Sequence, residues 1–277
     1  MNTSGILCPG CKRLVSSDEE RCPYCGEKNP GSVFKNNLIF NSLINQDKII
    51  KIIIGINIFF FILSLVISVK ARPISINPLR FFSPDEKVLV LLGAGGRIPV
   101  EDFGYWWSFV SAGYLHSGIL HIFFNMAAFF QLFKIVADFY GISRTLIIYI
   151  LGGISGLFLS YLSGVSLTIG ASASVCGLIG ACLYYGKSRG GNFGKMIFKQ
   201  VIGWIVILLA FGLIIPGIDN FGHLGGIAGG FAAGFIFKYH EKRPESQVDR
   251  FSALFFIVLT LIILVFCAYN GLMLLFL

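Results

Sequence analysis

Long apolar stretches alternate with short polar ones from about residue 50 to the end of the chain. An apolar run of about 20 residues can cross the roughly 30 Å hydrocarbon core of a bilayer as an α-helix. The fourth and sixth runs are shorter than this and are rich in small residues. The pattern predicts an all-α polytopic membrane protein with seven spans, at 50–69, 117–137, 144–163, 172–186, 196–214, 222–238 and 252–276.

The composition supports a membrane protein over a soluble one. Apolar residues make up 55% of the 277 residues and charged residues 13%, with a mean hydropathy of +0.78. Soluble globular domains carry about 25% charged residues. The net charge of +8 does not point to nucleic acid, because most Lys and Arg residues stand at the ends of the apolar runs, where orientation in the membrane accounts for them. We therefore expect the lipid bilayer as a partner and no nucleic acid.

The short loops predict the orientation in the membrane. The stretches 187–199 and 238–250 carry four Lys or Arg residues each, whereas 163–171 and 214–222 carry none. Because short basic loops stay on the cytoplasmic side, the N-terminus is predicted in the cytoplasm and the C-terminus outside, in the cell (inner) membrane. The polar opening residues lack the pattern of a cleavable signal peptide, so we expect the first span to direct insertion.

One connection is unusually long. Residues 70–116, between the first two spans, contain several prolines and a glycine cluster at Gly93, Gly95 and Gly96. Connections of this length usually carry function, so we expect a functional element on the outer side. Residues 31–48 form a connector before the first span.

Two polar residues stand at matching depths in the short fourth and sixth runs. Ser172 begins the fourth run and lies 15 residues before Lys187, and His223 lies 15 residues before Lys238. At 1.5 Å per residue this is about 22 Å, so both residues should lie at a similar depth below the outer surface. A serine hydroxyl becomes a strong nucleophile when a neighbouring base takes its proton. Ser172 and His223 are therefore a candidate catalytic pair.

Small residues would let the helices of this pair come close together. Three glycines follow His223 at offsets of 3, 7 and 11, and they form one stripe on the helix surface. This spacing lets membrane helices pack closely, and the fourth run has similar rows of Ala, Gly, Ser and Cys. The glycines of the stripe are Gly226, Gly230 and Gly234.

Further polar groups suit an oxyanion hole. Ser172 follows Gly170 closely at the start of its helix, where free backbone N–H groups favour a developing negative charge. His121 and Asn125 are four residues apart in the second run and share a helix face, with His116 shortly before them. Polar groups inside a membrane span are costly and mark function by default.

Alternative roles remain for three polar residues. Ser174 is a second candidate nucleophile, but it points about 200° away from Ser172 around the helix. Asp219 is either a third catalytic residue or, as we favour, the N-cap of the sixth helix. His116 is equally consistent with an interfacial residue that takes no part in catalysis. Other intramembrane protease chemistries fit worse, because the sequence has no His-Glu-x-x-His zinc motif and no pair of mid-membrane aspartates.

Four cysteines in the first 25 residues form two C-x-x-C pairs that ten residues separate. Four thiolates at this spacing suit a tetrahedral structural zinc site, and a 30-residue segment with almost no core would gain its folding free energy from the metal. A redox role lacks the βαβ context that it would need. The segment resembles a small zinc ribbon, for which a cytoplasmic protein partner is one hypothesis. The four residues are Cys8, Cys11, Cys22 and Cys25.

Together, these features resemble the rhomboid protease family over about residues 50–240. The resemblance implies a six-helix rhomboid core plus a seventh C-terminal transmembrane helix, preceded by the small four-cysteine zinc ribbon. The matching positions are Trp106-Trp107, Leu115-His116, His121, Asn125-Met126, Gly170-Ala171-Ser172-Ala173, and His223 with Gly226 and Gly230. The implied organisation is a ribbon at 1–30, a linker at 31–48, a catalytic membrane domain at 49–240, and a loop with the extra helix at 241–277.

The resemblance also implies a mechanism. Ser172 would be the nucleophile and His223 the general base, a dyad without a carboxylate and without a cofactor for catalysis. His121, Asn125 and the backbone N–H of Ser172 would form the oxyanion hole. Substrates would be single-pass membrane proteins cut near the outer face, the fifth span would be their gate, and the long outer loop would lie half-submerged beside the site. Supporting positions would be His116, Gly170, Gly226 and Gly230.

Three positions depart from the family pattern. Ser108 stands where an arginine is frequent, Cys176 where an aromatic residue commonly stacks on the histidine, and Gly222 where alanine is usual. These differences keep a second hypothesis open, a catalytically weak or inactive relative that acts as a membrane scaffold or chaperone for client helices. Such relatives typically lack the serine or the histidine, and both are present here.

Overall fold

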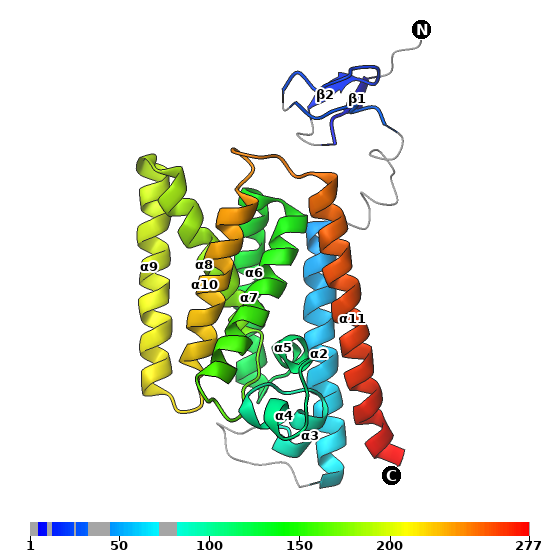
Figure 1. Cartoon of the computed structure of the whole chain (residues 1–277), viewed down its shortest axis with the longest axis vertical. Helices are drawn as coiled ribbons and strands as arrows, with labels where there is room; N and C mark the ends of the chain where they lie inside the picture. The colour runs from blue at the N-terminus through cyan, green and yellow to red at the C-terminus, as the bar shows by residue number, and fades with distance from the viewer. Residues whose placement is uncertain (1–4, 10–12, 25, 33–44, 72–81, 277) are drawn as a thin grey trace.

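The computed structural model describes all residues except 1–4, 10–12, 25, 33–44, 72–81 and 277. Among the described residues, seven long helices run side by side, with short helices gathered near one end (Figure 1). The long helices are α2 (Gln46–Ala71), α6 (Ile119–Tyr140), α7 (Ile142–Leu162), α8 (Ser172–Arg189), α9 (Gly191–Ile214), α10 (Asn220–Phe237) and α11 (Gln247–Phe276). The short ones are α3 (Glu86–Leu91), α4 (Arg97–Glu101), α5 (Ser108–Ser111) and the 3-10 helix η2 (Ala112–Tyr114).

Each predicted span coincides with one long helix. The chain is an integral membrane protein. Within the described part of the chain, five helices are long and apolar enough to cross a membrane, namely α2, α6, α7, α9 and α11. Helices α8 and α10 have 18 residues each and are rich in glycine, so the count of seven spans stays a prediction. Helix α2 begins before the apolar run because the side chain of Asn45 caps it, accepting the N–H of Asp47 at 2.9 Å.

Successive long helices run in opposite directions, so their connections alternate between the two ends of the bundle (Figure 1). The α8–α9 turn and the α10–α11 loop, which contain the basic residues, lie at one end. The short helices α3, α4 and α5 lie at the other end (Figure 1). The orientation prediction requires the basic loops to share one end of the bundle, and they do (Figure 1). That this end faces the cytoplasm stays a prediction.

Glycines bring α8 and α10 into backbone contact. A Cβ atom added at Gly226 would lie 2.2 Å from the carbonyl oxygen of Ala173, and one at Gly230 would lie 1.8 Å from that of Gly177. Both α10 partners stand 53 positions after their α8 partners, so the two helices are parallel and in register. The glycine stripe read from the sequence is therefore a helix-packing surface.

The outer loop is pinned to the segment that precedes α8. Gly95 and Thr168 exchange two backbone hydrogen bonds, of 3.0 and 2.8 Å. The N–H of Arg97 donates to the carbonyl of Val165 at 2.7 Å, and that of Gly170 donates to the carbonyl of Ala112 at 2.9 Å. The long loop thus fixes the backbone that leads into Ser172. Its half-submerged position stays a prediction, and residues 72–81 of it lie outside the described residues.

A buried arginine holds α11 against the rest of the bundle. Arg144, in the first turn of α7, is fully buried and pairs with Asp249 of α11 at 2.9 Å. Its guanidinium also donates to the backbone carbonyls of Lys238, Arg243 and Pro244 in the α10–α11 loop. Every donor direction is used, as a buried charge requires. We call this set of contacts the Arg144 clamp.

The N-terminal residues form a small separate unit. Strands β1 (Gly5–Leu7) and β2 (Leu14–Ser16) pair in antiparallel register. The N–H of Cys8 donates to the carbonyl of Arg13, and the N–H of Cys22 donates to that of Glu27, each at 2.8 Å. In each C-x-x-C segment, the first cysteine therefore donates its N–H to the carbonyl five positions on. Cys11 and Cys25 lie outside the described residues.

Candidate active site

Ser172 is the first residue of α8, and its surroundings depend on Gly170. Gly170 has a φ of +125°, which favours glycine. A Cβ atom added there would lie 2.7 Å from Nε2 of His121 and 3.8 Å from Oγ of Ser172. Glycine therefore leaves room for the imidazole of α6 to approach the serine hydroxyl. The free N–H groups of the first turn of α8 lie at the same place.

His223 lies in the first turn of α10 and is 5% exposed. The register of α8 and α10 places His223 level with Gly170. Ser172 is two residues further on, so His223 and Ser172 differ in height along the helices by about 3 Å. No hydrogen bond joins the Ser172 hydroxyl to His223 in the described part of the chain. Catalytic hydrogen bonds are often long before a substrate binds.

The hydrogen bonds of His121 fix where its proton lies. Its Nδ1 accepts the backbone N–H of Ser117 at 3.3 Å and lies 2.9 Å from the Ser117 hydroxyl. A backbone N–H can only donate, so the proton of the neutral ring stays on Nε2, the atom that faces Gly170 and Ser172. His116 is fully buried and packs edge-on against His121, with ring centroids 5.1 Å apart. His116 is thus a core residue beside the site.

Asn125 lies one turn below His121 on the same face of α6. Its Nδ2 donates to the backbone carbonyl of His121 at 2.9 Å, and the second hydrogen of the amide remains for another acceptor. Ile122 and Met126, also on α6, form an apolar cluster with Ala171. This contact fixes α6 against the residue that precedes Ser172.

Asp219 caps α10, as the sequence predicts. Its carboxylate accepts the N–H of Gly222 at 2.9 Å and the hydroxyl of Thr168 at 2.7 Å, and it also accepts the hydroxyl of Ser160. The carboxylate forms no hydrogen bond to His223 in the described part of the chain. The roles of Ser160 and Thr168 are missed by sequence reasoning, because these residues stand more than 50 positions before Asp219 and carry no motif.

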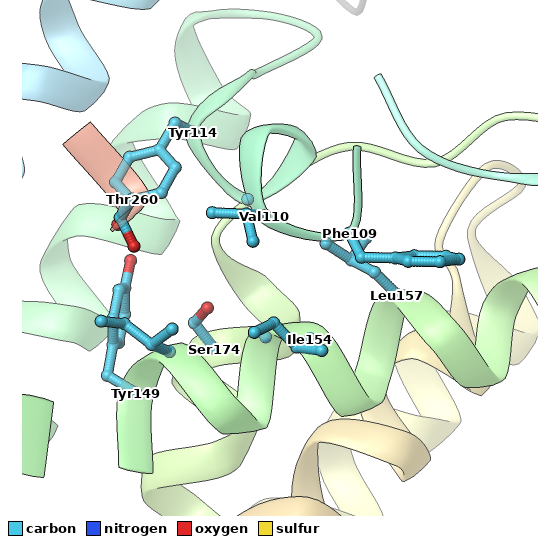
Figure 2. Close-up of a pocket in the computed structure, with 11 residues that line it drawn as sticks. Phe109, Val110, Tyr114, Tyr149, Ile154, Leu157, Ser174 and Thr260 are labelled. Carbon is cyan, nitrogen blue, oxygen red and sulfur yellow. The ribbon is translucent and has the colours of Figure 1, made fainter. Parts of the chain in front are cut away.

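Ser174 faces away from α10. Its side chain packs on α7, where a Cβ atom added at Gly153 would lie 2.2 Å from its hydroxyl oxygen. Figure 2 shows this hydroxyl at a small cavity that Tyr149 of α7 and Thr260 of α11 also line. The structure therefore separates the two serines: Ser172 lies beside His121, and Ser174 lies on the opposite side of α8.

The three departures from the family pattern have visible surroundings. Cys176 is buried under Gly226, whose added Cβ atom would lie 2.9 Å from the Cβ atom of Cys176, so a small side chain suits the close approach of α10. At Gly222 an added Cβ atom would lie 2.8 Å from the Asp219 carboxylate. Ser108 is fully buried, and its hydroxyl has no hydrogen-bond partner among the described residues.

Comparison with known proteins gives consistent matches. The Rhomboid domain matches residues 104–240. The chain is 36% identical over 151 residues to "Rhomboid protease GluP" of Bacillus subtilis (strain 168), which covers 54% of this chain and 30% of that protein. It is 30% identical over 183 residues to "Rhomboid-like protease 5" of Toxoplasma gondii, covering 64% and 22%.

Another Toxoplasma gondii protein, "Rhomboid-like protease 3", is 30% identical over 217 residues, and the match covers 77% of each chain. The first two relatives are much longer than the aligned region, so the present chain spans less than a third of their length. The matched region contains every residue of the candidate site from His116 to His223 and the glycines that follow it. The chain belongs to the rhomboid family.

Proposed function

We propose that this protein is an intramembrane serine endopeptidase that cleaves transmembrane segments of membrane-protein substrates. The observation that carries the proposal is that Ser172 and His121 lie on either side of Gly170. His223 of α10 stands at about the same height in the bundle. A nucleophile, a base and charge-stabilising donors would thus come from three helices. Relatives that are named as rhomboid proteases support the same reading.

The chemistry would proceed in two halves. The Ser172 hydroxyl attacks the carbonyl carbon of the scissile peptide while His223 takes its proton. The oxyanion that forms accepts hydrogen bonds from the Ser172 N–H, from Nε2–H of His121 and from the second N–H of Asn125. The proton passes from His223 to the leaving amine and the C–N bond breaks. Water then attacks the acyl-enzyme, with His223 again as base, and releases the acid.

The substrates we propose are single-pass membrane proteins that reach the site sideways from the lipid. Helix α9 is the most exposed candidate span, since 6% of its most apolar window is buried inside the protein. A helix so loosely covered suits the role of a gate. We further propose a cell-membrane location with the N-terminus in the cytoplasm, which would put Ser172 near the outer face.

The test is labelling with a fluorophosphonate serine probe in detergent. Wild type should be labelled, Ser172→Ala and His223→Ala should not, and Ser174→Ala should be labelled as wild type is. Ser174→Ala is the matched control, because it removes a hydroxyl from the same helix on the other face. Folded wild type that neither labels nor cleaves a model transmembrane substrate would instead support the client-binding scaffold.

We also propose that the N-terminal unit holds a structural zinc ion. Cys8 and Cys22 are both buried in one small cluster with Val15, and each donates its N–H to the carbonyl five positions on. Thiolates of this kind suit Zn²⁺, with Cys11 and Cys25 as the other two ligands. A cytoplasmic protein is the partner we propose for this unit.

Replacement of Cys8 and Cys22 by serine in the full chain should remove about one equivalent of bound zinc, measured by elemental analysis of purified protein. Cleavage in detergent should stay within about twofold of wild type, because the unit is built apart from the candidate site. Unchanged metal content would rule out the zinc site, and complete loss of cleavage would rule out its independence.

A further inference from the structure

A small cavity lies behind the candidate site, between the outer loop and three long helices. It has a volume of about 10 Å³ and is lined by residues of α5, η2, α7, α8 and α11. A cavity of this size is about the smallest that can hold one water molecule. Most of the wall is apolar, but four hydroxyl-bearing side chains line it, those of Tyr114, Tyr149, Ser174 and Thr260 (Figure 2).

Tyr149 carries the argument. Its side chain is 1% exposed, and its hydroxyl has no hydrogen-bond partner among the described residues. Figure 2 shows this hydroxyl facing the hydroxyl of Thr260. A buried hydroxyl without a partner is costly, and a water held by two to four polar groups removes that cost.

We propose that this cavity is a binding site for a single water molecule, held by the hydroxyls of Tyr149, Ser174 and Thr260. The water would connect α11 to α7 and to α8, two residues from Ser172. Since Ser174 faces away from α10, this water is distinct from the one that hydrolyses the acyl-enzyme. The seventh helix would thus be joined to α8 through one bridging molecule, which adds to the stability of the bundle.

The sign of the stability change tests the proposal. If water is bound, Tyr149→Phe removes one of its partners and should lower the thermal midpoint of the full chain in detergent by about 2–4 °C. In a dry cavity, the same change removes an unpaired hydroxyl and raises the midpoint or leaves it unchanged. Tyr140→Phe calibrates the measurement, because the Tyr140 hydroxyl donates directly to the carbonyl of Ala181 at 2.9 Å and its loss should lower the midpoint.

A double-mutant cycle tests whether the hydroxyls of Tyr149 and Thr260 are partners of the same water molecule. Tyr149→Phe and Thr260→Val should be non-additive, because both remove partners of one molecule. Additive effects, or a raised midpoint in Tyr149→Phe, would overturn the water site.

A second inference rests on an independent contact, between α9 and α10. The side chain of Asn220 donates to the backbone carbonyl of Leu209 in α9 at 3.2 Å. A Cβ atom added at Gly212 would lie 2.0 Å from the Asn220 amide oxygen. The Asn220 side chain therefore fits against α9 only because residue 212 is glycine. Asn220 begins α10, three residues before His223.

We infer that Asn220, seated against Leu209 and Gly212, is a latch that holds the outer end of α9 closed over the candidate site. This inference rests on the proposed function, in which α9 is the gate. A single hydrogen bond to a carbonyl is modest in free energy, so the latch can open without unfolding either helix. It would decide how readily a transmembrane substrate enters, and it would not affect a small soluble probe.

Two glycine substitutions on α9 form a matched pair for the test. Gly212→Ala should displace the Asn220 amide and raise cleavage of a transmembrane substrate by about fivefold, the change expected when one ordinary hydrogen bond of the closed state is lost. Gly203→Ala adds the same methyl group where nothing lies within 4 Å and should change nothing. Fluorophosphonate labelling should be the same in wild type and in both variants.

Asn220→Ala should reproduce the effect of Gly212→Ala without adding bulk. Equal cleavage by both glycine variants, or a parallel fall of cleavage and labelling in Gly212→Ala, would overturn the latch. Wild type that does not label would instead refute the proposed function itself, so the two failures are distinguishable.

Discussion

At the scale of single residues, existing hydrogen bonds orient the two side-chain donors of the candidate oxyanion hole, His121 and Asn125. The Nδ1 atom of His121 is engaged by Ser117, which leaves Nε2–H for an oxyanion. Asn125 has given one amide hydrogen to its own helix and keeps the other. Both donors are therefore held in place before a substrate binds, which is the condition for effective charge stabilisation.

Asn125→Ala should lower the rate of cleavage by roughly 100-fold, the effect of removing one oxyanion-hole donor. The change should appear mainly in kcat, because the oxyanion exists only in the transition state and the intermediate. Kinetics on a fluorogenic transmembrane substrate would measure it. A rate equal to that of wild type, in a variant of unchanged thermal midpoint, would remove Asn125 from the oxyanion hole.

The Asp219→Asn variant distinguishes two roles of Asp219, as the N-cap of α10 and as a charged catalytic residue. An asparagine side chain still accepts the N–H of Gly222 and caps the helix about as well as aspartate does, so we expect cleavage to fall less than tenfold. Loss of an essential triad carboxylate would instead cost about 10⁴-fold. Comparison of kcat for the two proteins decides between these roles, and a 10⁴-fold loss would contradict the capping role.

At the scale of helices, periodicity and small-residue spacing predict much of the arrangement. Seven apolar runs predict the seven long helices, and the stripe of Gly226 and Gly230 predicts the close approach of α10. The sequence does not predict the contacts that depend on distant segments. The carboxylate of Asp219 meets Thr168, and Gly95 pairs with that same residue, only because the fold brings three segments together. Local sequence patterns carry no information on contacts between residues that are distant in the sequence.

Gly230→Ala should destabilise the bundle, because its added methyl group would lie 1.8 Å from the Gly177 carbonyl oxygen and would push α8 and α10 apart. Overpacking of this kind costs about 1–3 kcal/mol or more. Gly55→Ala on α2 is the matched control, since nothing lies within 4 Å of its added Cβ atom. Thermal unfolding in detergent should show a lower midpoint for the first variant only. Equal midpoints would mean that α8 and α10 do not need this contact.

At the scale of the whole molecule, α11 meets the core at its beginning and near its middle. The Arg144 clamp holds its beginning, and the cavity beside Thr260 lies nearer the candidate site. Sequence periodicity identifies α11 as a helix but does not predict the clamp, since Arg144 stands 105 positions before Asp249. A buried arginine in the first turn of an apolar helix is the one local signal of such a partner.

Arg144→Met should lower stability by about 3 kcal/mol, because it leaves the carboxylate of Asp249 buried with a weaker set of partners. Asp249 would keep the half-exposed Arg243, whose guanidinium lies 2.7 Å away, so the lower part of the usual range applies. The three loop carbonyls that Arg144 binds would lose this donor at the same time. Limited proteolysis between residues 238 and 250 should therefore become faster.

The double variant Arg144→Met with Asp249→Leu tells whether the clamp supplies stability or only neutralises its own charges. Replacing both partners by apolar residues commonly recovers the loss, and we expect most of the roughly 3 kcal/mol to return in unfolding measurements. Proteolysis of the loop should stay fast, because its carbonyls still lack the guanidinium. A double variant as unstable as Arg144→Met alone would mean that the carbonyl contacts, and not the ion pair, attach α11 to the core.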